Sequence, residues 1–178
     1  PLEQRESSRR GVSMLKALLD EMPEAPSPLL VRPPQDYDPG RAGSIQGLTL
    51  DTTRGDLVKG MLEGIALQTG LVQRRLDGTG ITIEGYRVTG GGSRTDLWVA
   101  LYADVLGKPV ERTTTPQSAA LGAALLAGVG VGAYESLGDG VSALVHVERT
   151  FEPDTARHRV YAERALALER SCMSAANA

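Results

Sequence analysis

Residues 81–113, ITIEGYRVTGGGSRTDLWVALYADVLGKPVERT, pass from a strand pattern through a run of glycines into a helix pattern and then into a second short strand. The β-branched and aromatic residues between Ile81 and Val88 favour an extended strand. Gly107 stands where glycine commonly ends a helix. The order strand, glycines, helix, strand predicts an α/β fold.

The glycines Gly90, Gly91 and Gly92 lie between the first strand and the helix. Successive glycines let backbone N–H groups turn toward one point, and a helix that begins near Ser93 directs its positive end at the same space. Phosphates are commonly bound in this way, so the turn is a candidate site for an anion or a nucleotide. The spacings GxxxxGK[ST] and GxGxxG are absent, which argues against a P-loop or a Rossmann site.

A purely structural alternative explains part of this pattern. Ser93 and Asp96 have the spacing of a capping box, in which a serine and an acidic residue satisfy the first N–H groups of a helix. This interpretation needs no ligand and stays open beside the first.

A long amphipathic helix is predicted from Asp56 to Leu76, after a capping-box pattern at Thr53 and Asp56. Its expected apolar stripe consists of Leu57, Met61, Leu62, Ile65, Leu71 and Leu76. Glycines inside a helix are unfavourable unless another backbone comes close. Close contacts are therefore expected at Gly60, Gly64 and Gly70.

The flanking segments complete the outline. A short helix is expected around residues 14–19, a proline-rich extended loop over 23–43 and a short strand over 44–51. Residues 116–134 form a predicted helix of small and aliphatic side chains, which is expected to be buried. A loop and a short extended segment then lead into a final helix that carries Val160, Tyr161, Ala165, Leu166 and Leu168.

Composition limits the functional classes. With 178 residues and 41% hydrophobic content, one domain with a real core is the default. A formal net charge of −3 argues against a dedicated nucleic-acid binder, and no apolar run reaches the ~20 residues of a membrane span. One cysteine, Cys172, and two histidines, His146 and His158, leave no expected metal site. We expect a cytoplasmic protein, and the start at Pro1 suggests a fragment of a longer polypeptide.

Residues 43–66, GSIQGLTLDTTRGDLVKGMLEGIA, resemble the C-terminal signature of the FGGY carbohydrate kinases, a family that includes glycerol, xylulose and fuculose kinases. Residues 88–111 are similar to the nucleotide-side loop and helix of this family, and residues 115–134 to the Ala/Gly-rich helix that follows. Gly60 departs from the usual Ala or Ser. The segment 29–43 lacks the GER of the sugar-side loop.

The resemblance implies a ribonuclease-H-like fold of the actin and hexokinase type, a mixed sheet with helices on both faces. Residues 1–178 would then be the C-terminal domain of a kinase that transfers the γ-phosphoryl group of ATP, bound with Mg²⁺, to a hydroxyl group of a sugar or polyol. It also implies that Gly90, Gly91, Gly92 and Ser93 approach the nucleotide and that Thr95 contacts it. The catalytic base and most of the sugar site would belong to an N-terminal domain outside this chain, so no catalytic residue or metal ligand is assigned here.

Several other points stay open or favour structural roles. One alternative is a non-catalytic module for nucleotide sensing or assembly, which would have the same fold but would not transfer a phosphoryl group. Glu63 is interpreted as a buried hydrogen-bonding residue rather than a general base, and Trp98 with Tyr102 as a contact between helix and core. The identity of the sugar and the existence of a homo-oligomer are not decided by the sequence. The chain alone is expected to bind ATP weakly and to turn over nothing.

Overall fold

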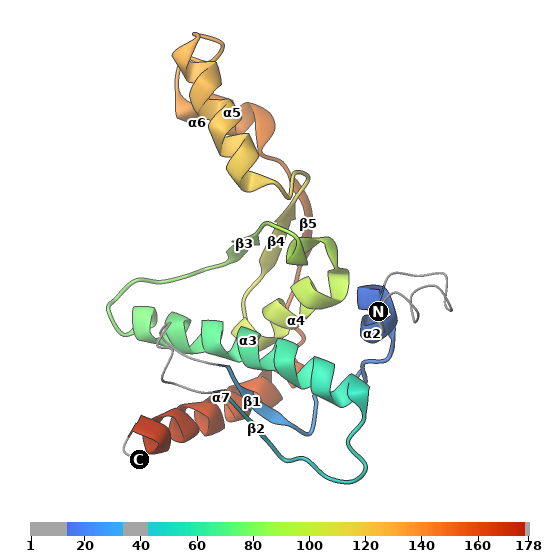
Figure 1. Ribbon diagram of the computed structural model, residues 1–178. Helices are drawn as coiled ribbons and strands as arrows, with labels where there is room; N and C mark the ends of the chain where they lie inside the picture. The colour runs from blue at the N-terminus through green and yellow to red at the C-terminus, as the bar shows by residue number, and fades with distance from the viewer. Residues whose placement is uncertain (1–13, 34–42, 177–178) are drawn as a thin grey trace. The chain divides into compact units, whose positions relative to one another are not determined.

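The computed structural model describes residues 14–33 and 43–176 (Figure 1). Residues 34–42 of the proline-rich loop and the residues before Met14 lie outside this description, as does the side chain of Cys172. The helices are α2 (Met14–Asp20), α3 (Arg54–Asp77), α4 (Asp96–Leu106), α5 (Ser118–Gly130), α6 (Leu137–Leu144) and α7 (Thr155–Ala176), with a 3₁₀ turn, η1, at Gly92–Arg94. The strands are β1 (Leu30–Arg32), β2 (Ser44–Gln46), β3 (Tyr86–Val88), β4 (Val110–Thr113) and β5 (Val147–Phe151).

The chain divides into two compact units. The first comprises Pro1–Arg75 and Arg159–Ala178, and the second comprises Leu76–His158. In the first unit β1 and β2 pair antiparallel, with Leu30 opposite Gln46. The second unit has a mixed sheet in the order β3-β4-β5, in which β3 is parallel to β4 and β4 is antiparallel to β5. The predicted α/β fold with a mixed sheet is confirmed.

The start of α3 has the predicted capping box. The backbone N–H of Thr53 donates to Asp56 Oδ2 at 2.9 Å, and the N–H of Asp56 donates to Thr53 Oγ1 at 3.1 Å. The two residues therefore satisfy each other's exposed backbone donors.

The buried face of α3 coincides only in part with the predicted apolar stripe, of which Leu71 is buried. Met61, Ile65 and Leu76 are exposed, and the helix instead buries a face that contains Gly60 and Gly64. A Cβ at Gly64 would lie 2.5 Å from the carbonyl oxygen of Val31, and a Cβ at Gly60 would lie 3.2 Å from Val31 Cγ2. The close backbone approach expected at the helix glycines is confirmed at Gly64, whereas Gly60 is close to side-chain atoms of Ser27, Leu29 and Val31. The expectation for Gly70 stays a prediction.

Glu63 has the structural environment that the sequence favoured. Its carboxylate is 1% exposed and accepts hydrogen bonds from the backbone N–H of Ser27 at 3.0 and 3.2 Å. Tyr161 Oη donates to Oε1 at 2.9 Å, and Arg164 Nη1 donates to Oε2 at 2.7 Å. The carboxylate thus ties α3 and α7 to the segment before β1 in the first unit.

Burial raises the pKa of Glu63 above its ordinary value of 4.5. Hydrogen bonds from Ser27 and Tyr161 and the positive charges of Arg164 and Lys59 act in the opposite direction and only partly offset it.

The core of the second unit lies between α4 and the sheet. Val99 and Ala103 of α4 pack with Val110 of β4 and Phe151 of β5. Gly107 ends α4 in the left-handed conformation at φ +63°, as predicted, and its N–H donates to the carbonyl oxygen of Ala103.

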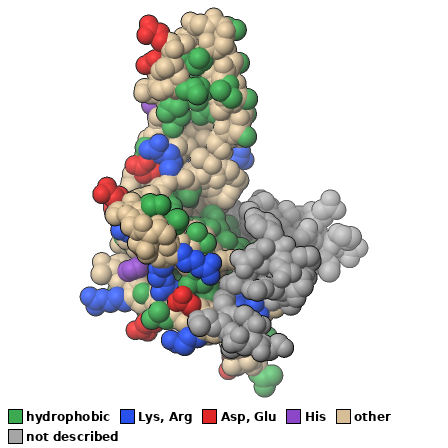
Figure 2. Space-filling view, turned by 90° about the vertical axis from the view of Figure 1, so that its left-hand side faces the viewer, with side chains coloured by type: hydrophobic (Ala, Val, Ile, Leu, Met, Phe, Trp, Pro, Cys, Tyr) green, Lys and Arg blue, Asp and Glu red, His purple; other side chains and the backbone are tan. Residues whose placement is uncertain are grey.

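The helix α5 is formed as predicted, but the expectation that it is buried is wrong for this chain. Leu125 is its only buried residue, whereas Leu126 is 64% exposed. The helix packs against α6, and hydrophobic side chains remain visible on the surface of this region (Figure 2). The small and aliphatic composition thus predicted the helix but not its exposure.

The segment before β5 contains a helix, α6, where the sequence predicted a loop. Its N-cap is Ser136, whose Oγ accepts from the N–H of Asp139 at 3.2 Å. The spacing Ser-x-x-Asp was a capping signal, but two glycines follow within the segment and obscured it. In the residues that the structure describes, no helix is both long enough and apolar enough to cross a membrane.

Candidate functional site

The turn between β3 and α4 begins at Gly90. This residue has φ +87°, a left-handed conformation that side chains with a Cβ rarely adopt, so glycine is required here. Its N–H donates to the carbonyl oxygen of Pro116 at 2.8 Å. The turn is therefore bonded to the segment that precedes α5.

Ser93 stabilises the turn through a hydrogen bond of its buried side chain. It is buried, and its Oγ donates to the carbonyl oxygen of Gly90 at 2.8 Å. Thr95, not Ser93, is the N-cap of α4, and its carbonyl oxygen accepts from the N–H groups of Trp98 and Val99. The capping box proposed for Ser93 and Asp96 is wrong because Ser93 lies within the η1 turn, where its hydroxyl group is bonded to Gly90.

Asp96 instead binds two arginines. Arg112 Nη1 lies 2.6 Å from Asp96 Oδ1, and Arg149 Nη1 lies 2.5 Å from Oδ2. The hydrogen bond from Arg112 is the largest cause that lowers the pKa of Asp96, and the charges of both arginines add to it against partial desolvation. Asp96 is therefore a carboxylate that joins the start of α4 to β4 and β5.

The glycines differ in what surrounds them. A Cβ at Gly90 or Gly91 would meet no atom within 4 Å, so the space beside both residues is open. A Cβ at Gly92 would lie 2.8 Å from Trp98 Nε1. Gly90 and Gly91 thus leave room for a ligand, whereas Gly92 makes room for the protein's own indole.

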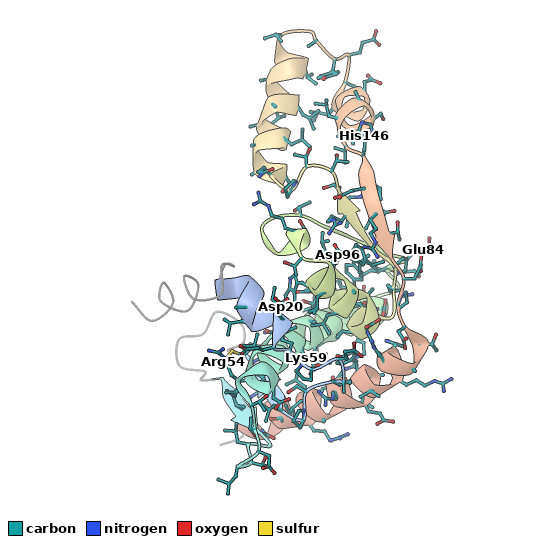
Figure 3. The ribbon with its side chains drawn as sticks, turned by 90° about the vertical axis from the view of Figure 1, so that its right-hand side faces the viewer. Asp20, Arg54, Lys59, Glu84, Asp96 and His146 are labelled. Carbon is teal, nitrogen blue, oxygen red and sulfur yellow. The ribbon has the colours of Figure 1, made fainter. Side chains whose placement is uncertain are left out.

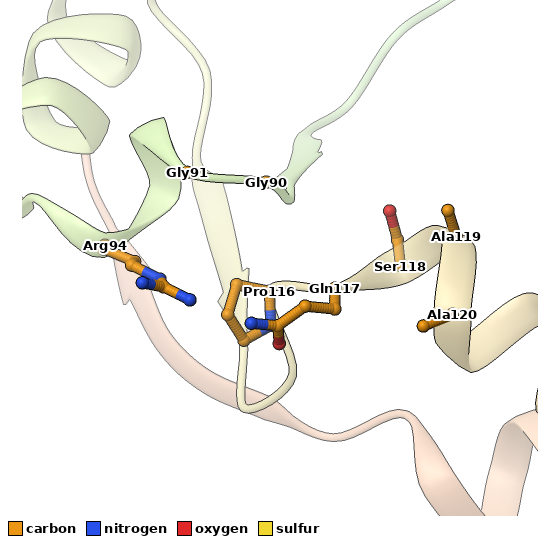
Figure 4. Close-up of a pocket in the computed structure, with 8 residues that line it drawn as sticks. All are labelled: Gly90, Gly91, Arg94, Pro116, Gln117, Ser118, Ala119 and Ala120. Carbon is orange, nitrogen blue, oxygen red and sulfur yellow. The ribbon is translucent and has the colours of Figure 1, made fainter.

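A cavity of about 400 Å³ lies beside the open glycines (Figure 4). Arg94 extends from the turn toward Pro116 and Gln117 on the opposite wall (Figure 4). The lining residues are Gly90, Gly91, Arg94, Pro116, Gln117, Ser118, Ala119 and Ala120. Of the residues singled out from the sequence, Gly90 and Gly91 line this cavity; Gly92, Ser93 and Thr95 support the turn behind it.

The second wall of the cavity, from Pro116 to Ala120, is one that sequence reasoning missed. Because β3 and β4 are parallel, their carboxyl ends lie at the same edge of the sheet, and the connections that follow them meet there. Ser118 Oγ donates to Thr89 Oγ1 at 3.1 Å and joins the two connections. The repeated order of strand, short connection and helix was the signal that could have predicted this wall.

The chemistry of the cavity suits an anion. The first N–H groups of a helix have no acceptor within it, and the first three residues of α5 line the cavity. Arg94 adds a guanidinium group, which can donate several hydrogen bonds to phosphate oxygens. Glycine on the facing wall lets a large ligand approach the backbone. Among the described residues no group of three or more His, Cys, Asp or Glu side chains could hold a metal ion.

Comparisons with known proteins agree with this arrangement. The sequence model described as "FGGY family of carbohydrate kinases, C-terminal domain" matches residues 31–131. A glycerol kinase from Bordetella parapertussis is 44% identical over 118 residues, which are 66% of this chain and 23% of that protein. A glycerol kinase from Dechloromonas aromatica is 37% identical over 139 residues, 76% of this chain and 28% of that protein. The chain therefore spans about a quarter of the length of these relatives.

Solved structures with the same fold are sugar and polyol kinases. The xylulose kinase from Rhodospirillum rubrum has a TM-score of 0.75 and 31% identity, over 95% of this chain and 34% of that one. The crystal structure of Plasmodium falciparum glycerol kinase with ADP has a TM-score of 0.70 and 26% identity, over 87% of this chain and 33% of that one. The fold is the ribonuclease-H-like type of these kinases, as the sequence predicted.

Proposed function

The chain belongs to the FGGY family of carbohydrate kinases, with its match in the C-terminal domain of that family, and on this premise we propose that it supplies the ATP side of a sugar or polyol kinase. The complete enzyme transfers the γ-phosphoryl group of ATP to a hydroxyl group of its acceptor. The glycerol and xylulose kinases similar to this chain make these two compounds the first acceptors to consider.

The observation that carries the proposal is the cavity beside Gly90 and Gly91. It combines two glycines with open space, the N-terminus of α5 and the guanidinium group of Arg94. A nucleoside triphosphate needs close backbone approach and positive charge to bind its phosphates. ADP in the related glycerol kinase from Plasmodium falciparum supports the same class of ligand for this chain.

The residues of the turn have different roles in this proposal. Gly90 and Gly91 present backbone to the nucleotide, and Arg94 neutralises part of its charge. Ser93 supports the conformation of Gly90 through its hydrogen bond to the Gly90 carbonyl oxygen. Thr95, the N-cap of α4, does not line the cavity and is expected to contact a part of the nucleotide that extends past the lining, and Gly92 is expected to keep the turn close to Trp98.

Magnesium enters the proposal with the nucleotide. Among residues 14–33 and 43–176, no group of three or more His, Cys, Asp or Glu side chains could hold a metal ion, and we assign no separate metal site to them. Mg²⁺ usually keeps several waters and binds through substrate phosphates in enzymes that use ATP. We expect it to arrive with ATP, held by phosphate oxygens and by groups outside this chain.

The remaining parts of the reaction are assigned elsewhere. Phosphoryl transfer needs a base for the attacking hydroxyl and positioned charge around the γ-phosphate. The buried carboxylate of Glu63 is fully engaged with Ser27, Tyr161 and Arg164 and is not available for that role. The base and the acceptor site belong to a preceding domain of a longer cytoplasmic polypeptide.

An acceptor panel tests the proposal. The longer polypeptide is incubated with ATP, Mg²⁺ and either glycerol, xylulose or other polyols and sugars, and ADP release is measured. Release that depends on one acceptor supports the kinase. Binding of ATP without acceptor-dependent release would instead support a nucleotide-sensing module and would contradict the proposed function.

A further inference from the structure

The carboxylate of Asp96 is bound on both of its oxygens by arginines from two strands. Arg112 of β4 contacts Oδ1 at 2.6 Å, and Arg149 of β5 contacts Oδ2 at 2.5 Å. Asp96 is the first residue of α4 (Figure 3), so these bonds fix the start of the helix to the sheet.

Arg112 is the more constrained of the two arginines. Its side chain is 13% exposed, compared with 55% for Arg149. Its Nε and Nη2 donate to Glu148 at 3.0 and 3.4 Å, and its guanidinium group lies 5.4 Å from the ring centre of Phe151. Partial burial and several partners distinguish this group from an exposed ion pair, which contributes little.

Arg112 also reaches the glycine turn directly. Its Nη1, besides contacting Asp96, donates to the carbonyl oxygen of Ser93 at 3.4 Å. The hydroxyl group of the same serine donates to the carbonyl oxygen of Gly90 at 2.8 Å. A continuous set of hydrogen bonds therefore runs from β4 through Ser93 to the wall of the cavity.

We propose that Arg112 is a positioning residue for the nucleotide: through Asp96 and the Ser93 carbonyl group it fixes the Gly90–Gly92 turn, and it does not touch the ligand itself. The inference rests on the proposed function of the cavity. Its physical basis is that a binding surface made of backbone has no side chains to adjust, so its affinity depends on how firmly the backbone is placed.

A matched control lies on the same sheet. Arg87 of β3 forms an ion pair with Glu111 of β4, with Nη2 at 2.6 Å from Oε2. This pair has the same chemistry and a neighbouring position, but none of its bonds reaches the turn. Replacing either arginine by glutamine removes the same charge.

The first test is steady-state kinetics of the longer polypeptide carrying Arg112→Gln, Arg112→Lys, Asp96→Asn or Arg87→Gln. The KM for ATP should rise roughly tenfold in Arg112→Gln and Asp96→Asn, while the KM for the acceptor changes little. Arg112→Lys keeps the charge but cannot bind Asp96, Glu148 and Ser93 together, so it should rescue only part of the loss. Arg87→Gln should match the wild type.

The second test does not depend on kinase activity. Hydrogen exchange in the 178-residue chain without nucleotide should be faster at the amides of Gly90 and Thr95 in Arg112→Gln and Asp96→Asn, but unchanged in Arg87→Gln. These amides donate to Pro116 and Gly92 in the ordered turn. If wild-type protein has no acceptor-dependent activity, the proposed function fails, and exchange still tests the placement of the turn.

Unchanged exchange at these amides, or a KM for ATP equal to that of the wild type, would overturn the inference. If Arg112→Gln does not fold, Asp96→Asn decides the question, because the substitution is isosteric and the side chain of Asp96 is more than half exposed. An equal rise in KM for ATP and for the acceptor would also count against it, since that pattern indicates a general loss of structure.

Discussion

The indole Nε1 of Trp98 lies 2.8 Å from the position that a Cβ atom at Gly92 would occupy. Any movement of the ring away from this position would disturb its edge-to-face contact with Tyr102, at a centroid distance of 4.8 Å. A side chain at Gly92 would therefore disturb the packing of Trp98 against Tyr102 in α4.

Gly92→Ala should destabilise the chain by about 1 to 3 kcal/mol, since the methyl group overpacks the space taken by the indole. Urea unfolding measures the loss. Trp98 is the only tryptophan in the sequence, so its emission should also change in the folded variant. Gly91→Ala is the control, because its Cβ meets open space. Equal stability of the two variants would contradict the steric link.

Gly91→Val should fold normally and bind ATP poorly. Gly91 has ordinary helical angles, φ −63° and ψ −39°, and a side chain there would project into open space at the cavity wall. In the longer polypeptide we expect the KM for ATP to rise much more than the KM for the acceptor. Gly130→Val, at the other end of α5 where a Cβ also meets no atom, is the control. An unchanged KM for ATP would remove Gly91 from the binding surface.

Arg94→Gln should raise the KM for ATP by about threefold to tenfold, as expected for losing one charged hydrogen-bond donor at a partly exposed site. The difference from the wild type should shrink as salt is added, because an exposed guanidinium group is screened. Arg159→Gln removes the same charge from an exposed position on α7 outside the cavity and should have no such effect. A salt-independent difference would show that Arg94 acts through structure rather than charge.

Glu63→Gln should change how stability depends on pH. Burial raises the pKa of Glu63, so the folded chain holds this proton more tightly than the unfolded chain. Its contribution to the free energy of unfolding is fully present below the ordinary value of 4.5 and is lost as the pH rises through the raised pKa. The stability of the wild type relative to the variant should therefore fall as the pH rises above the ordinary value of 4.5 and through the raised pKa.

Urea titrations at several pH values measure this difference, with Glu152→Gln as a control at an exposed glutamate. A difference that grows with pH would mean that the hydrogen bonds from Ser27 and Tyr161 outweigh burial. That outcome would reverse the sign assigned to the pKa shift.

Helix ends were predicted correctly where they depend on the conformation or hydrogen bonds of one or two neighbouring residues. Gly107 predicted the end of α4, and Thr53 with Asp56 predicted the start of α3. The Ser93–Asp96 pair had the same local pattern but failed, because Ser93 lies inside a 3₁₀ turn and Thr95 is the N-cap of α4. Spacing alone does not reveal such a turn, since its bonds depend on how Gly90 is tied to Pro116.

Predictions of burial were less reliable. Apolar periodicity selected Met61 and Ile65 for the core, but the buried face contains Gly60 and Gly64, which pack closely against the segment from Ser27 to Val31. The cavity was half predicted: its glycine wall was visible in the sequence, but the wall from Pro116 to Ala120 depends on the parallel pairing of β3 and β4. Such long-range pairing is not encoded by any single segment.

The contact between Gly64 and the Val31 carbonyl oxygen limits which substitutions α3 can accept. Even alanine, the smallest replacement, would place its Cβ atom too close to this main-chain oxygen. We therefore expect substitutions of Gly64 to be selected against. Met61 and Ile65, half exposed to water, can be exchanged for many other residues. Among descendants of this sequence, the glycine face of α3 should change most slowly. The exposed apolar face, which contains Met61 and Ile65, should change faster.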